Sequence, residues 1–479
     1  MGRNSLLLKN TFIISIGKVC TQLITYLLLP IYTTILTPSD YGTIDLLLTY
    51  ILLISPVITI QMEMSIFRFL IDTRGNKQET ARVLSNCLAC AMGPSLLFII
   101  LYFPIALSLD FEYLGPFLSG IITNSILCIA LQIARGLGDN MSYAVGSAIS
   151  GIMTVLLNII FVIIFPYGVA GMLYSTAIAQ FIAFCYIIIR DEVCEYIDFS
   201  LLCRNLMKKM ARYSVPLILN GLSWWIISAS DRTLASVVLG THANGILAVV
   251  IKFSAIVTNV FAIFNLSWTE SVAVHINDKD RDIYISDITQ KCFNLFSTGG
   301  IVLIMICAVF FKYLVNEKFY EAYPLIPLFV IGNIINIIQT LYGIIYIGKK
   351  DTKQVSRTAF IAAIVNFITN VIFIKYIGLY AAAISTISAM LFLAIYRHKD
   401  INRNMNITLD AKDIWIMCGI YAIFVFIYLI RNPICNIIGL VTSICFAMLW
   451  NKAIITSVLF YIKDKFPARI RKRPSTDSQ

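Results

Sequence analysis

Charged residues are scarce in this chain, and long polar segments that could form a soluble domain are missing. Only 13% of the 479 residues are Asp, Glu, Lys or Arg, and three are His, whereas about 25% of the residues of a soluble domain are charged. The ATP-binding pattern G-x-x-x-x-G-K-[ST] is also absent, which argues against direct ATP coupling. Hydrophobic residues instead make up 59% of the chain, and the mean hydropathy is +0.83. These values indicate an integral membrane protein.

Apolar runs of membrane-spanning length recur along the whole chain. They predict an all-α polytopic membrane protein with about 14 transmembrane helices. We place these helices near residues 11–35, 42–69, 82–108, 114–135, 142–165, 169–189, 214–238, 246–275, 288–311, 323–347, 357–374, 378–396, 413–430 and 434–456. The first run is too long for a signal peptide and has no small-residue cleavage site, so we expect a retained helix.

Basic side chains account for the net charge of +11. Most of them fall in alternate connections and in the C-terminal tail, and the positive-inside rule then places both termini in the cytoplasm. We interpret these segments as topology determinants with some lipid-phosphate contact, and expect no nucleic-acid partner. The twelve cysteines mostly lie in apolar segments, which favours small buried hydrophobes over metal ligands.

The chain contains an internal repeat. Residues 167–176 are echoed by 377–386 at an offset of 210, and residues 36–42 by 239–245 at an offset of 203. Repeats of six helices insert with the same orientation and are related by an axis along the membrane normal. We therefore predict four parts: an N-lobe of helices 1–6 (1–190), a cytoplasmic linker (191–213), a C-lobe of helices 7–12 (214–396), and helices 13 and 14 with a basic tail (397–479).

Three basic residues, Lys18, Arg232 and Lys252, lie inside the predicted spans. A charge within the bilayer costs several kcal/mol and marks a substrate or ion pathway by default. Shifting Lys18 by the repeat offset gives Gly221, and Arg232 follows eleven residues later, on nearly the same helix face. The three cations thus predict a ladder along one cleft between the lobes, which suits an anionic cargo.

Other polar residues share these faces at helical spacing. Gln22 lies on the Lys18 stripe, Trp225 lies on the Arg232 face and could stack on a sugar, and Asn259 lies on the Lys252 face. Two pairs of charged residues are eighteen residues apart along a helix, which is five whole turns. One joins Asp45 to Glu63, and the other joins Lys252 to Glu270.

The acidic residues allow a second interpretation as charge partners. Glu63 could neutralise Lys18, and Asp231 could neutralise Arg232 or Lys252, as structural pairs that fix helix packing. Asp45 and Glu270 lie near predicted helix ends, where interfacial solvation is an alternative to a transport role.

The chain also resembles a known family. The segment Thr34-Ile-Leu-Thr-Pro-Ser-Asp-Tyr41-Gly42, followed by a second span ending in Ser65-Ile-Phe-Arg68-Phe69, is similar to polysaccharide biosynthesis flippases that move lipid-linked O-antigen or capsule repeat units. These flippases belong to the multidrug/oligosaccharidyl-lipid/polysaccharide exporter superfamily. The resemblance implies two six-helix lobes, often with two more helices, and a V-shaped cationic cavity with alternating access. The family's intramembrane cations are matched here by position type at Lys18, Arg232 and Lys252.

The resulting hypothesis is a flippase for a polyprenyl-pyrophosphate-linked oligosaccharide in a bacterial cytoplasmic membrane. Lys18 would receive the pyrophosphate, and Arg232 with Lys252 would hold it in the outward-facing state. A proton or sodium gradient would supply the motive force, with Asp231 or Glu63 as the titrating residue. Membrane lipids and a polysaccharide polymerase are the other expected partners, and no cofactor is expected.

Four alternatives stay open on the sequence alone. Fourteen helices also resemble the branch that flips the peptidoglycan lipid precursor, and the same superfamily includes cation-coupled multidrug exporters, for which an acidic cleft would be expected. A membrane enzyme would normally carry a larger outer loop with Asp, Arg or His clusters. A purely structural protein would not need charges on equivalent faces of two repeats.

Overall fold

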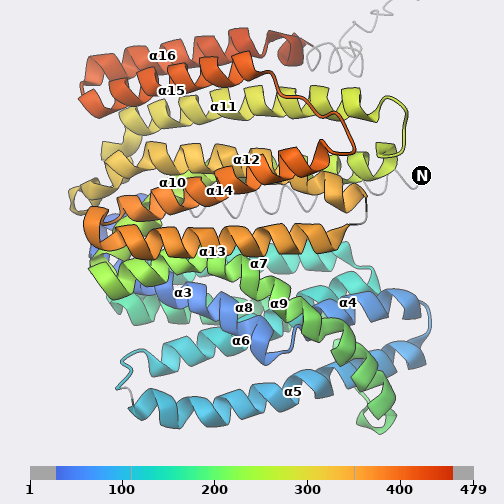
Figure 1. Ribbon diagram of the computed structural model, residues 1–479. Helices are drawn as coiled ribbons and strands as arrows, with labels where there is room; N and C mark the ends of the chain where they lie inside the picture. Colours follow the sequence, from blue (N-terminus) through green and yellow to red (C-terminus); the bar gives the residue numbers. More distant parts are fainter. Residues whose placement is uncertain (1–27, 109, 350, 457–479) are drawn as a thin grey trace, which may run out of the picture. The chain divides into compact units, whose positions relative to one another are not determined.

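The computed structural model describes residues 28–108, 110–349 and 351–456, with side chains for all of these except 219–228, 266 and 352. Helices and their connections make up this part of the chain, and no strand occurs within it (Figure 1). The all-α class predicted from the sequence is therefore confirmed. The chain forms two compact units.

The first unit comprises residues 1–253, 312–325 and 353–389. Its helices are α2 (Leu29–Ile35), α3 (Pro38–Ile58), α4 (Met62–Thr73), α5 (Lys77–Ser108), α6 (Leu114–Leu137), α7 (Asn140–Asn158), α8 (Gly168–Arg190), α9 (Arg204–Leu234) and α13 (Thr352–Ile377), with parts of α10 and α14 and the short η5 (Glu317–Leu325). Two π-helical turns, η1 (Ile159–Ile164) and η4 (Ala235–Leu239), extend α7 and α9, and two 3₁₀ turns, η2 (Val193–Tyr196) and η3 (Phe199–Leu201), precede α9.

The second unit comprises residues 254–311, 326–352 and 390–479. Its helices are α11 (Arg281–Leu314), α12 (Ile326–Gly348), α15 (Ala411–Ile430) and α16 (Pro433–Trp450), together with the later parts of α10 (Thr241–His275) and α14 (Tyr380–Ile401). In Figure 1, α15 and α16 run side by side in the red end of the chain.

Twelve helices within the described residues are long and apolar enough to span a membrane. They match twelve of the predicted spans, although several begin or end some residues outside the predicted bounds. Of the two other predicted spans, 11–35 falls largely outside the described residues, and 214–238 corresponds to the later part of α9 with η4. The total of 14 stays a prediction.

The predicted span 42–69 is wrong as a single helix. It divides into α3 and α4 because Ile60 and Gln61 adopt left-handed backbone conformations, with φ of 52° and 50°. Pro56 lies one turn earlier, where its ring and missing N–H weaken the helical ladder. A helical register therefore does not carry from Asp45 to Glu63, and the five-turn alignment of these two carboxylates is corrected.

The repeat has local counterparts in the backbone. Gly168 and Gly378 are equivalent at the offset of 210, and both have positive φ, of 54° and 58°. Glycine adopts this conformation without the steric cost of a Cβ. Each glycine lies at or just before the start of a long helix, α8 or α14, so the two halves make the same turn into the same element.

The repeat partners Gly42 and Gly245 meet each other where α3 crosses the start of α10. A Cβ on Gly42 would collide with the backbone oxygen of Thr241, and a Cβ on Gly245 would collide with that of Pro38. Pro38 and Thr241 are themselves equivalent at the offset of 203, so the contact is reciprocal. A reciprocal contact is what a two-fold relation between repeats produces.

Side chains reinforce this crossing, which we call the glycine crossing and define as residues 38–42 and 241–245. The Ser39 and Thr241 hydroxyl oxygens are 2.6 Å apart, and Asn244 Nδ2 donates to the Gly42 carbonyl at 2.7 Å. Both helices are thus held with their backbones in direct contact.

Candidate functional site

An ion pair joins α9 to α3 within the first unit. The Arg232 Nε lies 2.8 Å from Asp45 Oδ2, and the two side chains are 18% and 21% exposed. Asp45 is thus an ion-pair partner of Arg232, a pairing that the sequence did not predict. Asp45 is thus partly buried and paired with a cation of another helix.

Lys252 of α10 lies close to this pair and against two tyrosine rings. Its Nζ is 5.1 Å from the ring centroid of Tyr41 and 5.9 Å from that of Tyr32, distances at which a cation is attracted to an aromatic face. Both rings are buried. The Tyr32 hydroxyl accepts a hydrogen bond from Asn158 Nδ2 at 2.7 Å, which fixes that ring.

We call Arg232, Lys252, Asp45, Tyr32 and Tyr41 the cation cluster. Lys252 interacts electrostatically with both Asp45 and Arg232, so two cations share one carboxylate. Arg presents a planar fork suited to bidentate phosphate contact, and Lys presents a mobile point charge. The excess positive charge equips the cluster to bind an anion.

Asp231 points into a different environment, between α9, α13 and α14. It is buried, and its carboxylate accepts hydrogen bonds from Asn370 Nδ2 at 2.6 Å, Thr386 Oγ1 at 3.0 Å and Ser385 Oγ at 3.4 Å. Asn366 belongs to the same group, because its Nδ2 reaches Ser385 Oγ at 3.3 Å. We call these five residues the oxygen cluster.

The oxygen cluster has the donor set of a site for a small hard cation, since carboxylate, amide and hydroxyl oxygens are the ligands such ions prefer. The Asn370 Oδ1 is buried without a hydrogen-bond partner, and it would become a further ligand if a cation entered. No group of three or more His, Cys, Asp or Glu side chains suited to a metal occurs within the described residues. The cluster therefore fits a monovalent ion or a proton better than a transition metal.

The oxygen cluster is confined to the second repeat. At the repeat offsets, Asp231 corresponds to Leu28 and Asn370 to Ile160. Ser385 and Thr386 do have equivalents in Ser175 and Thr176, but the first repeat supplies no carboxylate for them. This asymmetry shows that the carboxylate is not a general requirement for packing these helices.

The other predicted site residues are placed separately. Lys18 and Gln22 lie outside the described residues, and the side chain of Trp225 does as well. Glu63 is buried and accepts a hydrogen bond from the Thr59 hydroxyl at 2.9 Å. Asn259 and the exposed Glu270 follow Lys252 along α10.

Sequence reasoning missed the neutral members of both clusters. The tyrosines of the cation cluster are not charged, so the search for intramembrane charge passed over them. Asn366 and Asn370 are spaced i and i+4 on one predicted span, which places them on one helix face, and this spacing was an available signal. Ser385 and Thr386 had been noticed only as part of the repeat.

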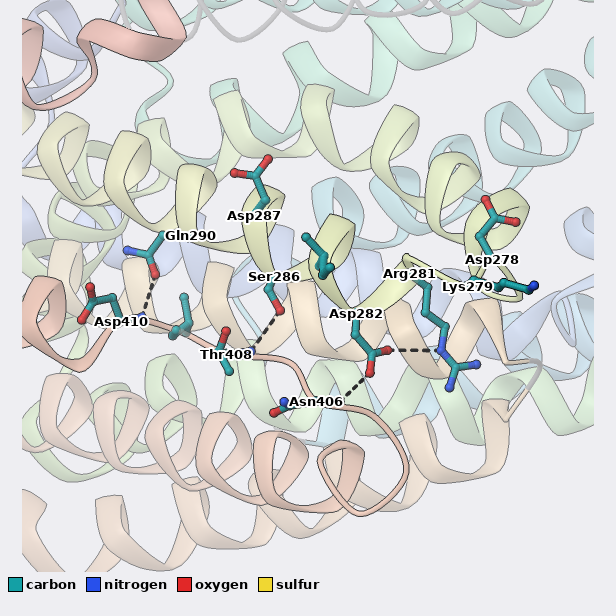
Figure 2. A pocket seen from close by; sticks show the side chains of 12 residues that line it. Asp278, Lys279, Arg281, Asp282, Ser286, Asp287, Gln290, Asn406, Thr408 and Asp410 are labelled. Atoms are coloured by element: carbon teal, nitrogen blue, oxygen red, sulfur yellow. Dashed lines mark hydrogen bonds and ion pairs between the residues drawn. The ribbon is translucent and has the colours of Figure 1, made fainter.

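The second unit has a polar pocket of about 1090 Å³ at the start of α11 (Figure 2). Figure 2 shows the segment 406–410 lying along α11, where the N–H groups of Asn406, Thr408 and Asp410 donate to side chains of the helix. The acceptors are Asp282 Oδ2 at 2.8 Å, Ser286 Oγ at 3.0 Å and Gln290 Oε1 at 2.9 Å. We call this segment the strap. None of the predicted site residues lines the pocket. The hydrogen bonds of the strap fix the chain just before the start of α15.

Comparisons with known proteins agree with this architecture. Residues 7–268, more than half of the chain, match the polysaccharide biosynthesis protein family, and the chain belongs to that family. No curated protein matches it. Among solved structures, it is similar to the lipid II flippase MurJ in an inward closed conformation, with 15% identity, a TM-score of 0.71, and coverage of 94% of this chain and 100% of that chain.

Multidrug transporters share the fold as well. An inward-facing multidrug resistance MATE family transporter of the MOP superfamily matches with 15% identity and a TM-score of 0.64, over 80% of this chain and 96% of that chain. An outward-facing MATE family transporter matches with 16% identity and a TM-score of 0.56, over 82% and 96%. The resemblance predicted from the sequence is thus confirmed. The chain is a multi-pass membrane protein, and its family and fold support a flippase or transporter.

Proposed function

We propose that the protein is a flippase for a polyprenyl-pyrophosphate-linked oligosaccharide of the O-antigen or capsule type. The observation that carries the proposal is the cation cluster, in which Arg232 pairs with Asp45 and Lys252 lies near enough to interact electrostatically with both. A pyrophosphate carries more negative charge than one carboxylate and offers more acceptor oxygens. It would therefore compete with Asp45 for the Arg232 fork and engage Lys252 at the same time.

Asp45 would occupy the anion-binding position next to Arg232 in the absence of cargo. While no cargo is bound, the ion pair keeps Arg232 oriented and avoids an uncompensated charge between helices. Pyrophosphate binding would release Asp45, and departure of the cargo would restore the pair. Lys18 would make the first contact from the cytoplasmic side, and Gln22, Trp225 and Asn259 would contact sugars. The membrane would be a bacterial cytoplasmic membrane, with both termini in the cytoplasm.

Transport would be coupled to an ion at the oxygen cluster. A buried carboxylate surrounded by amide and hydroxyl oxygens suits Na⁺, while a proton on Asp231 is the competing possibility. Asp231 and Arg232 are adjacent on α9. A cation bound by Asp231 would therefore change how α9 positions Arg232. Glu63 has only Thr59 as a described side-chain partner, which makes it a weaker candidate for ion coupling.

The proposed cargo predicts that Lys252→Gln will cut surface polysaccharide at least about tenfold in a host that lacks its own flippase. A charge-assisted contact contributes about 1.5–3 kcal/mol, and about 1.4 kcal/mol corresponds to a tenfold change. Lys375→Gln, which removes an exposed lysine at the end of α13, serves as the matched control and should leave polysaccharide unchanged. Equal membrane levels of both variants must be verified, and normal polysaccharide from Lys252→Gln would rule out its proposed role.

The proposed ion site predicts that Na⁺ raises the melting temperature of the purified protein by a few degrees relative to choline at the same ionic strength, because a ligand bound only to the folded state stabilises it. Asp231→Asn should abolish this increase, whereas Asp287→Asn, at an exposed carboxylate, should retain it. A melting temperature that responds to pH and not to Na⁺ would assign the cluster to a proton. An unchanged Na⁺ response in Asp231→Asn would place the ion elsewhere.

Two related functions make different predictions. A peptidoglycan-precursor flippase would support growth of cells depleted of their own, whereas a flippase for surface repeat units would not. A cation-coupled multidrug exporter would raise resistance to cationic compounds, a cargo that the excess positive charge of the cation cluster disfavours.

A further inference from the structure

An apolar groove of about 760 Å³ lies within the second unit, between α11, α12, α14 and α15. Its volume falls in the range of small-molecule sites, about 300–1,000 Å³. The wall is made almost entirely of aliphatic and aromatic side chains. The hydroxyl of Tyr421, which reaches the wall, already donates to the Ser297 carbonyl at 2.8 Å. The length of the groove therefore suits a hydrocarbon chain and offers little to a polar ligand.

One part of the groove is different, because His398 and Lys399 from the last turn of α14 line it. Both ring nitrogens of His398 have partners, Tyr342 Oη at 3.0 Å and Asn402 Nδ2 at 3.3 Å. Lys399 is exposed and has no ion-pair partner among the residues that the structure describes. The neighbouring carboxylate of Asp400 is engaged elsewhere, accepting from the Tyr346 hydroxyl at 2.8 Å.

We propose that this groove holds one acyl chain of a resident anionic phospholipid, whose phosphate contacts Lys399. The apolar wall and the single cation that lines it match an amphipathic molecule with an anionic head. Leu391, Ile395 and Ile414 line the groove with exposed side chains, which the chain would cover. The sequence predicts that residues 397–412 face the cytoplasm, where anionic lipids attract basic segments.

A phospholipid carries its own phosphate, which Lys399 at the groove can contact. The lining of the groove belongs to the second unit and the residues of the cation cluster belong to the first. Occupancy of the groove therefore does not require the residues proposed to bind pyrophosphate. The proposal is independent of the identity of the cargo.

The test measures lipids that remain bound to purified full-length protein after extensive detergent washing. Wild-type protein prepared from membranes containing phosphatidylglycerol and phosphatidylethanolamine should retain about one phosphatidylglycerol per chain by native mass spectrometry. Lys399→Gln should lower the retained phosphatidylglycerol about fivefold, the effect expected for one basic residue at a membrane surface. Lys208→Gln, at an exposed lysine in the predicted cytoplasmic linker, should retain wild-type levels.

A second variant tests the apolar part of the site. Ala422→Phe, at a small residue of the groove wall, should displace the acyl chain and abolish retention of either phospholipid. Size-exclusion elution and melting temperature identify any variant that has lost its fold, and Lys399→Gln, at an exposed position, keeps the test informative if Ala422→Phe does not fold. Equal phospholipid retention by wild type, Lys399→Gln and Lys208→Gln would overturn the proposal. So would recovery of a polyprenyl lipid in place of the phospholipid.

Discussion

A disulfide between cysteines introduced at Ser39 and Thr241 is expected to stop transport almost completely, and a reductant is expected to restore it. The two hydroxyl oxygens are 2.6 Å apart, so cysteines at these positions lie within reach of a disulfide with little backbone movement. The bond would lock α3 to α10 at the glycine crossing. If the cargo passes by alternating access, these helices must separate at some stage of each cycle.

The experiment requires a background in which the exposed native cysteines Cys194, Cys418 and Cys445 are replaced. Surface polysaccharide is measured with and without oxidant, and the fraction cross-linked is read from the shift in gel mobility. The single variants Ser39→Cys and Thr241→Cys control for the substitutions themselves. Normal polysaccharide with nearly all of the protein cross-linked would show that the crossing stays closed throughout transport.

Neutralising both members of the Arg232–Asp45 pair should restore stability without restoring transport. Arg232→Gln leaves Lys252 as the cation beside Asp45, whereas Asp45→Asn removes the carboxylate near both cations, so Asp45→Asn should lower the melting temperature more. In the double variant, two neutral amides can pair with each other and one of the two cations is gone, so the melting temperature should recover much of the loss caused by Asp45→Asn. Polysaccharide should remain at least about tenfold low, since the contact to the cargo is gone.

The double variant separates the two interpretations of this ion pair. A purely structural pair predicts that stability and transport recover together, whereas a cargo-binding Arg232 predicts that only stability recovers. Arg232→Lys with intact Asp45 is a further control, because it keeps the charge and loses the bidentate fork. Its polysaccharide level should fall between those of wild type and Arg232→Gln.

Hydropathy predicted most of the helices, because every apolar run of bilayer length in this chain has to satisfy its backbone internally. The break between α3 and α4 escaped prediction. Ile60 and Gln61 are not residues that favour a left-handed backbone, and a proline such as Pro56 is compatible with a kinked but continuous helix. The left-handed conformations at these two positions therefore have no signal in the sequence.

The candidate site was predicted in its residue types and incompletely in its pairings. Arg232, Lys252, Asp231 and Asp45 were selected as charges within spans, and all four have described interactions in the first unit. Which acid accompanies which base depends on how α3, α9 and α13 approach one another. Helical periodicity identifies the face of each helix but not the helix that packs against it, so the sequence did not pair Arg232 with Asp45.

The strap imposes a length restriction on the connection between α14 and α15. Alternate residues of an extended chain advance about 6.8 Å, whereas one step of four residues along a helix advances about 6.0 Å. The three hydrogen bonds to Asp282, Ser286 and Gln290 can tolerate this mismatch. It accumulates with each step, so a fourth donor along the strap would no longer lie opposite an acceptor on α11. Insertion of a single residue between Asn406 and Asp410 would turn the donors away from α11. Homologous chains that keep the three acceptor side chains should therefore differ in length in the loop before residue 406 and not in the strap itself.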